Sequence, residues 1–490
     1  MLSLIGSALL AHAAASTPEV WHLGKLALSR CELTQPQSAA TTAAWCADFA
    51  VPENRDEPRS RQIKLKLAIV RSEAAGVEDD PVVLLAGGPG QAATESYTAV
   101  AGALAPLRRH RHIVLLDQRG TGGSNALRCT DKETAEVLSD EQALTPQRAR
   151  DETKRCLEKV QAHADPRFYT TTEAIRDLDD LRIAMGGVRF NLVGVSYGTR
   201  VAQQYARTFP AGVRSMVLDG VAPNELVFGA DFARNLDDAL KARFATCDKN
   251  PDCKKAFGDI YKTLYDTRER LRAAPQTVTI RDPHTWAALE RHLDHDGFGG
   301  LVRLYAYSSE TAALLPVGIS ETSRGNPAPL LGQLRLLSDN FEAGLTSGMS
   351  LSVICAEDAD LLTDAPAEQR HLILGEDLIA TLRAQCEVWP HGKRPDDFHT
   401  ALKSDLPTLL MSGEFDPVTP ARYGDAVAKG LSRSRHLVAP GQGHNVIGRG
   451  CMPKLLKRFV EKLETDALDA GCIADLGATP FFLDYNGAAP

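Results

Sequence analysis

The sequence predicts an α/β protein whose central sheet is mostly parallel and flanked by helices. Short apolar runs alternate with helical patterns over much of the chain, as they do where parallel strands are joined by crossover helices. This alternation lapses in one long region and then resumes, which indicates an insertion in the core. The pentapeptide Gly194–Gly198, of the pattern G-x-S-x-G, lies between an apolar run and a helical pattern.

The predicted strands show two patterns. Residues 61–70 alternate apolar and polar side chains, as expected of a strand with one exposed face. The other strands are apolar throughout, as in strands buried on both faces, and comprise residues 81–85, 112–116, 190–195, 213–218, 407–411 and 436–439. Helical patterns separate them, notably at residues 171–185 and 199–208.

The region between residues 223 and 399 has few strand-like runs and several charged, helix-forming stretches. These stretches are Asp231–Thr246, Phe257–Ala273 and Ala367–Ala384. An independent second domain would have a similar composition, but the sheet pattern returns afterwards, which favours an insertion. We therefore expect a core formed by residues 16–222 and 400–490, with residues 223–399 as a large, mainly helical cap.

The charge distribution argues against a nucleic-acid partner. The 490 residues include 55 Lys and Arg and 63 Asp and Glu, which gives a net charge of −8 without long blocks of one sign. The sequence has no basic stripe and no interleaved aromatic platform. No stretch is apolar for long enough to span a bilayer, so we expect no stable membrane insertion.

Residues 1–15 have the pattern of a secretory signal peptide. A short apolar core ends in small residues, with A-x-A-like sites at residues 11–13 and 13–15. Lysine and arginine are missing before the apolar core, and a buried N-terminal helix is the alternative. The pattern predicts a secreted or periplasmic protein.

The cysteines also favour export. Ten are present, and neighbours along the chain enclose short loops in the order 31 and 46, 129 and 156, 247 and 253, 355 and 386, and 451 and 472. In an oxidising compartment an even set of this kind forms disulfides, and sequential pairing is our hypothesis. Metal binding is the rival interpretation, but no C-x-x-C pair or Cys/His cluster has zinc spacing.

The pentapeptide Gly194–Gly198 predicts a nucleophile elbow with Ser196 at its tip. A sharp turn from strand to helix leaves no room for nearby Cβ atoms, which explains the glycines. Such a turn strains the serine backbone and lifts the hydroxyl clear of the sheet, where a histidine can reach it.

A serine hydroxyl needs a base to take its proton, and the base needs an acid that holds its tautomer. In folds with this elbow the chain order is serine, acid, histidine. Asp416 lies in the loop after the run at 407–411, and His444 lies in a glycine-rich turn after the run at 436–439. We predict a triad of Ser196, Asp416 and His444. The rival acids and base are Glu414, Asp219 and His436.

An oxyanion hole requires backbone N–H donors. One should be the amide of Tyr197, the residue after the nucleophile. The second should come from the glycine loop at residues 86–90, where Gly88 is our choice and Gly87 the alternative. A phosphate-binding loop is disfavoured because no Lys-Ser/Thr follows and no G-x-G-x-x-G pattern fits.

These motifs together resemble the proline iminopeptidase family (peptidase S33) of α/β-hydrolases, and more closely its secreted, tripeptidyl-aminopeptidase-like branch. The likeness covers nearly the whole chain and rests on residues 87–90, 117–124, 194–198, the loops of Asp416 and His444, and the segments 45–53 and 354–358. One departure is Ala86, where many relatives carry histidine. The resemblance implies the α/β-hydrolase fold and the triad named above, with no metal or organic cofactor.

The resemblance also implies a serine aminopeptidase that removes N-terminal residues or short peptides from small peptide substrates through an acyl-enzyme. Such an enzyme must recognise a free ammonium group, and in the family the acids come from the cap. Glu357, with Asp358 and Asp360 nearby, is the best match, although solvated loop acids are the alternative. Arg119 is expected to brace the loop beneath the oxyanion hole.

Two other functions remain open on the sequence. A carboxylesterase would use the same triad, because fold and triad do not choose between amide and ester substrates. A binding protein on a hydrolase scaffold is disfavoured, since every catalytic position carries a competent residue.

Overall fold

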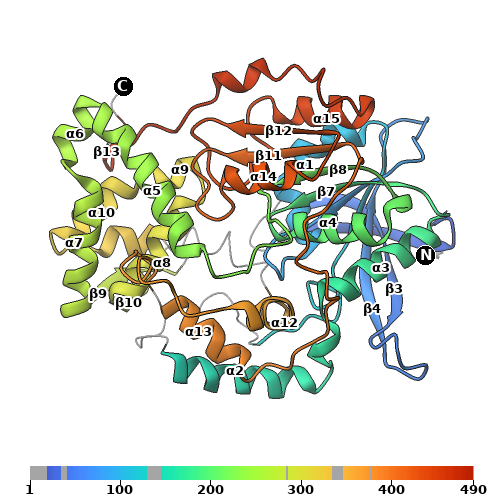
Figure 1. Ribbon diagram of the computed structural model, residues 1–490, viewed down its shortest axis with the longest axis horizontal. Helices are drawn as coiled ribbons and strands as arrows, with labels where there is room; N and C mark the ends of the chain where they lie inside the picture. Colours follow the sequence, from blue (N-terminus) through green and yellow to red (C-terminus); the bar gives the residue numbers. More distant parts are fainter. Residues whose placement is uncertain are drawn as a thin grey trace, which may run out of the picture.

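The computed structural model describes residues 19–34, 41–129, 145–282, 285–333, 346–375 and 377–488. A ten-stranded sheet runs through the core in the order β1-β2-β3-β4-β6-β5-β7-β8-β11-β12 (Figure 1). Its strands are β1 Val20–Leu23, β2 Leu26–Thr34, β3 Thr41–Pro52, β4 Gln62–Val70, β5 Val82–Leu85, β6 Ile113–Leu116, β7 Phe190–Val195, β8 Val213–Asp219, β11 Thr408–Gly413 and β12 Ser434–Ala439. The predicted signal peptide, residues 1–15, lies outside the described residues.

The strands from β6 to β12 in this order are parallel, and those from β1 to β4 are antiparallel. The α/β prediction and all seven predicted strands are confirmed. Strands β1, β2 and β3 were not predicted. Strand β1 alternates exposed and half-buried side chains, and β2 and β3 mix buried, half-buried and exposed ones, so no continuous apolar run marks them.

Alternate residues of the parallel strands point to two different helical layers. On one face, Leu192 of β7 joins an apolar cluster with helices α3 (Thr171–Ala184) and α4 (Tyr197–Thr208). On the other face, Val193 packs with α1 (Ala93–Arg108) and α15 (Met452–Lys462). Because both faces are covered, the strands read as continuous apolar runs.

Strands β8 and β11 are neighbours in the sheet, and the long segment of chain that joins them is called the insertion below. Its elements are α5 Phe232–Lys249, α6 Pro251–Phe257, α7 Ile260–Ala273, β9 Gln276–Arg281, β10 Ala288–Leu293, α8 His295–Ala306, α9 Ser309–Ala312, α10 Leu315–Ser323, α12 Ser347–Glu357 and α13 Asp377–Cys386. The β9–β10 hairpin is an unpredicted strand pair in a mainly helical segment.

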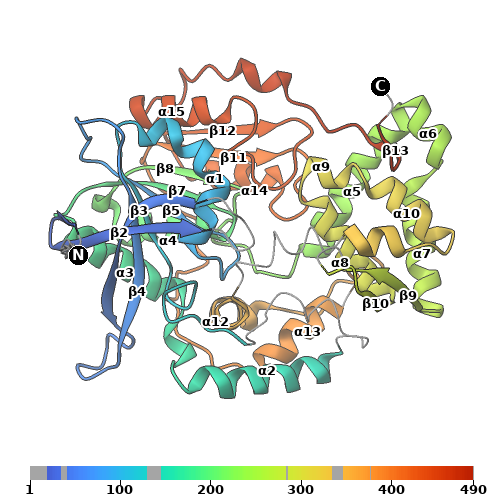
Figure 2. The ribbon, with the colours of Figure 1, turned by 180° about the vertical axis from the view of Figure 1, so that it is seen from behind.

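The insertion has two parts, and a segment from elsewhere in the chain packs against each part. Helices α5 to α10 gather around an apolar cluster of their own at one end of the molecule (Figures 1 and 2). The C-terminal strands β13 (Phe482–Asp484) and β14 (Gly487–Ala488) lie beside them, and the Phe482 amide donates to the Ala313 carbonyl at 3.0 Å. Helices α12 and α13 lie apart, beside α2 (Pro146–Gln161), which precedes β7 in the chain.

Five disulfides join the cysteines in the predicted sequential pairs. They are Cys31–Cys46, Cys129–Cys156, Cys247–Cys253, Cys355–Cys386 and Cys451–Cys472. Each bond closes a local loop, with sequence separations from 6 to 31 residues.

The remaining helix of the core, α14 (Ala421–Ala428), packs against β11 and β12. Among the described residues, no helix combines the length and the apolarity that a bilayer span requires.

Replacing both cysteines of the Cys355–Cys386 bond by serine should lower the free energy of unfolding by about 3–4 kcal/mol, because a long loop of the unfolded chain is released. The Cys247–Cys253 bond closes a loop of only 6 residues, so the same change there should lower the free energy of unfolding by about 2 kcal/mol. Urea unfolding of both double variants measures the difference. Equal stability of the two variants and the parent would contradict the structural role of the bonds.

Candidate active site

Ser196 stands at the turn between β7 and α4 with φ 54° and ψ −122°, a conformation that L-residues rarely adopt. Both flanking glycines are needed for the turn. A Cβ at Gly194 would lie 2.5 Å from the Gly198 carbonyl oxygen, and a Cβ at Gly198 would lie 2.1 Å from that of Leu85. The Ser196 amide donates to the Asp219 carbonyl at 2.8 Å. The predicted elbow is therefore present.

Asp416 and His444 are hydrogen-bonded, with 2.8 Å between Asp416 Oδ2 and His444 Nδ1. The second carboxylate oxygen accepts from the amides of Val418 and Thr419, each at 2.8 Å. Burial acts to raise the pKa of Asp416, but the charge of His444 and these hydrogen bonds hold it below its usual value. The acid therefore stays ionised beside the imidazole.

The imidazole lies beside the backbone that holds the elbow. Gly220 has φ +68°, and a Cβ there would lie 2.9 Å from Cε1 of His444. Gly220 directly follows Asp219, whose carbonyl binds the Ser196 amide. The structure thus brings the three predicted residues together around the end of β8.

The two rival acids hold the histidine loop instead of the imidazole. The Asp219 carboxylate accepts from the amides of Val446 and Ile447 at 2.9–3.0 Å, and burial raises its pKa to about 6. Glu414 accepts from the Gly441 amide at 2.7 Å. Glu414 therefore fixes the loop before His444, and Asp219 fixes it after His444.

The rival base, His436, belongs to a second Ser-His-Asp arrangement. Its Nε2 lies 2.9 Å from Ser412 Oγ, and its Nδ1 lies 2.8 Å from Asp425. Ser412 is fully buried in β11, and a Cβ at Gly424 would lie 2.5 Å from the ring. This group leaves no space for a substrate and ties α14 to the sheet.

The glycine loop after β5 lies against the elbow. A Cβ at Gly87 would be 3.2 Å from Ser196 Cβ, whereas a Cβ at Gly88 would meet the backbone of its own loop at Gly90. Tyr197 is the first residue of α4, where amides have no acceptor within the helix. The loop and the helix start are thus close enough for their amides to face one oxyanion.

A buried carboxylate fixes the start of the helix that follows the glycine loop. The Asp117 carboxylate accepts from the amide of Thr94 at 2.8 Å and from that of Gly123 at 3.1 Å, and burial raises its pKa. This ties the start of α1, just after the loop, to the end of β6. Arg119 is fully buried and makes two 2.7 Å bonds to Asp177 of α3. Its role is structural.

Glu357, at the end of α12, is fully buried close to the elbow. Its carboxylate accepts from the Thr171 amide at 2.6 Å and from the Thr171 hydroxyl at 2.9 Å. That hydroxyl lies 2.7 Å from the Tyr197 hydroxyl, so a short relay joins Glu357 to the residue after the candidate nucleophile. Burial raises the pKa of Glu357 to about 7.

The two neighbouring acids have other partners. Asp358 is fully buried, and its oxygens lie 3.0 and 3.3 Å from Nη1 of Arg200. The Arg200 guanidinium also lies 4.2 Å from the centre of the Phe228 ring. Asp360 is exposed and forms a two-point ion pair with Arg394, at 2.9 Å each. Glu357 lies beside the same guanidinium, with 4.0 Å between its Oε2 and Nη1 of Arg200, but its hydrogen bonds come from a hydroxyl and an amide.

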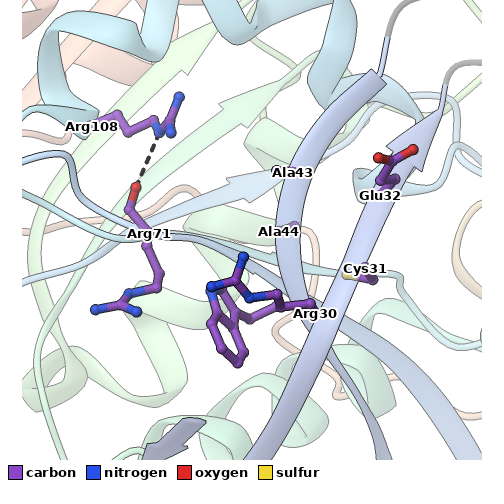
Figure 3. Close-up of a pocket in the computed structure, with 8 residues that line it drawn as sticks. Arg30, Cys31, Glu32, Ala43, Ala44, Arg71 and Arg108 are labelled. Carbon is purple, nitrogen blue, oxygen red and sulfur yellow. Dashed lines mark hydrogen bonds between the residues drawn. The ribbon is translucent and has the colours of Figure 1, made fainter. Parts of the chain in front are cut away.

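A surface cavity of about 460 Å³ lies toward the opposite edge of the sheet and contains none of these residues (Figure 3). It is bounded by β2, β3 and the end of α1. Its arginines already have partners, since Arg71 lies 4.9 Å from the Trp21 ring and Arg30 binds Glu19 at 2.6 Å.

Within the described ranges, no three His, Cys, Asp or Glu side chains gather to hold a metal ion.

A family model described as the alpha/beta hydrolase fold matches residues 80–449. The chain is an α/β-hydrolase. Serine protease Hip1 of Mycobacterium tuberculosis (strain ATCC 25618 / H37Rv) is 28% identical over 481 residues, which cover 90% of each chain. Carboxylesterase B of the same strain is 28% identical over 427 residues, 79% of this chain and 78% of that protein.

A tripeptidyl aminopeptidase of Streptomyces coelicolor is 31% identical over 193 residues, 36% of this chain and 35% of that protein. The family match confirms the predicted α/β-hydrolase fold. Together with the elbow serine and the protease-named relatives, it makes this α/β-hydrolase a serine hydrolase.

Sequence reasoning missed the partners of the candidate site residues. Thr171 binds Glu357, and Arg200 pairs most closely with Asp358, the residue after α12, yet neither Thr171 nor Arg200 lies in a motif. Both lie on helices α3 and α4, whose apolar faces point to the sheet, while α12 comes from the insertion. The only sequence signal for Thr171 and Arg200 was their polarity, at positions of helices that pack against the sheet.

Glu357→Gln should make the stability of this α/β-hydrolase less dependent on pH. The folded protein holds the Glu357 proton up to about pH 7, whereas the unfolded chain releases it near 4.5. The stabilisation is therefore complete below 4.5 and is lost as the pH rises through 7. Relative to the variant, the wild-type free energy of unfolding should fall by about 3 kcal/mol over this window.

Urea unfolding of both proteins from about pH 4.5 to about pH 7.5 measures this difference. Asp360→Asn is the control, because Asp360 is exposed and its pKa is lowered by Arg394. A constant difference between wild type and Glu357→Gln over the whole window would show that the carboxyl is not held neutral in the fold.

Proposed function

We propose that this α/β-hydrolase is an exported serine aminopeptidase of the proline iminopeptidase type, acting on small peptides. The observation that carries the proposal is Glu357, a buried carboxylate joined through Thr171 to Tyr197. A carboxylate at this depth, next to a serine hydrolase elbow, offers a partner for the ammonium group at the start of a peptide.

In the proposed mechanism, Ser196 Oγ attacks the scissile carbonyl while His444 Nε2 takes its proton. Asp416 accepts the Nδ1 proton of His444, which fixes the tautomer and stabilises the imidazolium. The imidazolium then protonates the leaving amine, and water attacks the acyl-enzyme with His444 again as the base. Because the pKa of Asp416 is lowered, the acid remains a carboxylate throughout.

The negative charge that develops on the carbonyl oxygen is assigned to the amides of Tyr197 and Gly88. The proximity of the preceding residue supports Gly88, because a Cβ at Gly87 would lie 3.2 Å from Ser196 Cβ. Asp117 supports the assignment, because it fixes the start of the helix that follows the loop.

Glu357 is assigned to the substrate ammonium, and Asp358 is not. Nη1 of Arg200 lies 3.0 Å from Asp358 and 4.0 Å from Glu357, so a second cation would be repelled more strongly at Asp358 than at Glu357. Binding of an ammonium group favours the ionised form of Glu357, so substrate binding should release a proton below about pH 7. The names of the Hip1 and tripeptidyl aminopeptidase relatives agree with a peptidase.

A carboxylesterase is the second candidate function, and one observation favours it. Glu357 is fully buried and both of its carboxylate oxygens already accept hydrogen bonds from Thr171, an arrangement that an esterase could leave unbroken. The relative named Carboxylesterase B covers most of the chain.

Export is supported by the disulfides. Five bonds of this kind persist in oxidising compartments and are rare where thiols are kept reduced. We therefore place the protein outside the cytoplasm, secreted or periplasmic.

Matched substrates should separate the two functions. Aminoacyl and tripeptidyl chromogenic amides with a free amine should be hydrolysed, N-acetylated ones should not, and Ser196→Ala should lower kcat by at least about 10⁴-fold. Glu357→Gln should lower kcat/KM on free-amine substrates by about 10–100-fold, the value of a charge-assisted hydrogen bond. Short p-nitrophenyl esters should be affected far less.

Asp360→Asn is the matched acid control, since its carboxylate is exposed and paired with Arg394. It should leave the ratio of free to acetylated turnover unchanged. If only the esters react, or if acetylation makes no difference, the aminopeptidase proposal fails and the esterase takes its place.

A further inference from the structure

The insertion contacts the loop that carries the candidate base. The His444 amide donates to the Tyr307 carbonyl at 2.7 Å, and Tyr307 follows the end of α8. Gly443 permits this approach, because a Cβ there would lie 2.2 Å from the same carbonyl oxygen and 3.3 Å from Ser308 Cα. The backbone of the insertion therefore lies directly on the backbone of the histidine loop.

The Tyr307 side chain contacts the imidazole as well. The two rings are 5.5 Å apart between centroids, with an angle of 87° between their planes. An edge-to-face ring of this kind limits rotation of the imidazole about its Cβ–Cγ bond. Tyr307 thus restrains both the position of the His444 backbone and the orientation of its ring.

The turn that carries Tyr307 is itself held in place. The Ser309 carbonyl accepts from Nη2 of Arg243 at 2.6 Å, and Arg243 is almost fully buried. The Ser309 hydroxyl accepts from the Thr479 amide at 2.8 Å. The next residue, Glu310, forms an ion pair with Arg449, with 3.0 Å between Oε2 and Nη2. Arg449 lies on the histidine loop, so the turn holds the loop at two places.

Both the core and the insertion hold residues 441–449. The core supplies Glu414 at Gly441 and Asp219 at Val446 and Ile447, as described above. The insertion supplies Tyr307 at His444 and Glu310 at Arg449. Of these contacts, the one from Tyr307 is made at the backbone of the histidine itself.

We propose that the turn Tyr307–Glu310 of the insertion is a positioning element for the base His444, with Tyr307 as the positioning residue. The inference rests on the proposed role of His444 in the triad. It assigns the insertion a part in the chemical step, in addition to any part in admitting substrate. Loss of the contact should leave substrate binding intact and slow proton transfer, because small displacements of a base reduce the rate steeply.

Gly443→Ala tests the backbone contact, because its methyl group would collide with the Tyr307 carbonyl oxygen. The variant should lose about 10–100-fold in kcat with little change in KM. Gly448→Ala is the matched control on the same loop, since a Cβ there would meet nothing within 4 Å. It should behave as the wild type.

Tyr307→Ala and Tyr307→Phe test the ring and cover the case in which Gly443→Ala does not fold. The alanine variant should lose about tenfold in kcat, and the phenylalanine variant, which keeps the ring, should retain wild-type kcat. A loss in kcat at constant KM in Gly443→Ala and Tyr307→Ala, with rescue by Tyr307→Phe, is a pattern that a merely structural role would not give.

Both substrates of the preceding section should be used. A positioning role slows p-nitrophenyl acetate and the peptide amide alike, whereas a substrate contact by Tyr307 would raise KM for the amide and spare the ester. If His444→Ala is inactive but Gly443→Ala and Tyr307→Ala keep wild-type kcat, the inference is overturned and the triad stands. If His444→Ala remains active, the proposed function itself fails.

Discussion

The candidate site depends on Asp219, the last residue of β8. Its carbonyl oxygen accepts the amide of Ser196, and its carboxylate accepts the amides of Val446 and Ile447. One residue on a buried strand therefore sets the distance between the nucleophile turn and the histidine loop. Asp219 is fully buried, so these amides replace the water that its carboxylate loses on folding.

The elbow is strained, and its neighbours make the strain tolerable. A non-glycine residue with positive φ costs on the order of 1–3 kcal/mol and persists only where the surroundings leave no alternative. Here the Asp219 carbonyl holds the Ser196 amide, and Gly194 and Gly198 pack against backbone with no space for a side chain. The strain is confined to the residue whose hydroxyl must be presented, and rigid elements on both sides maintain it.

Helix α12 links the insertion to both ends of the site. The amide of Thr346, just before its first turn, donates to the Gly90 carbonyl of the glycine loop at 2.9 Å, and Glu357 at its last turn binds Thr171. The α8–α9 turn makes a third contact at His444. The insertion is thus bound to the glycine loop, to Thr171 beside Tyr197 and to the histidine loop, so its position and the geometry of the site are linked.

The sequence by itself determined the parallel strands and the elbow, and it predicted the triad of Ser196, Asp416 and His444 and the sequential pairing of the cysteines. These features are local: each follows from a run of apolar residues, a glycine turn or a short loop between neighbours. Only the tertiary structure decided that Arg200 pairs with Asp358, that α2 lies beside α13 and that Tyr307 lies on His444. Such contacts join residues far apart in the chain, and they depend on how layers pack rather than on any pattern along one segment.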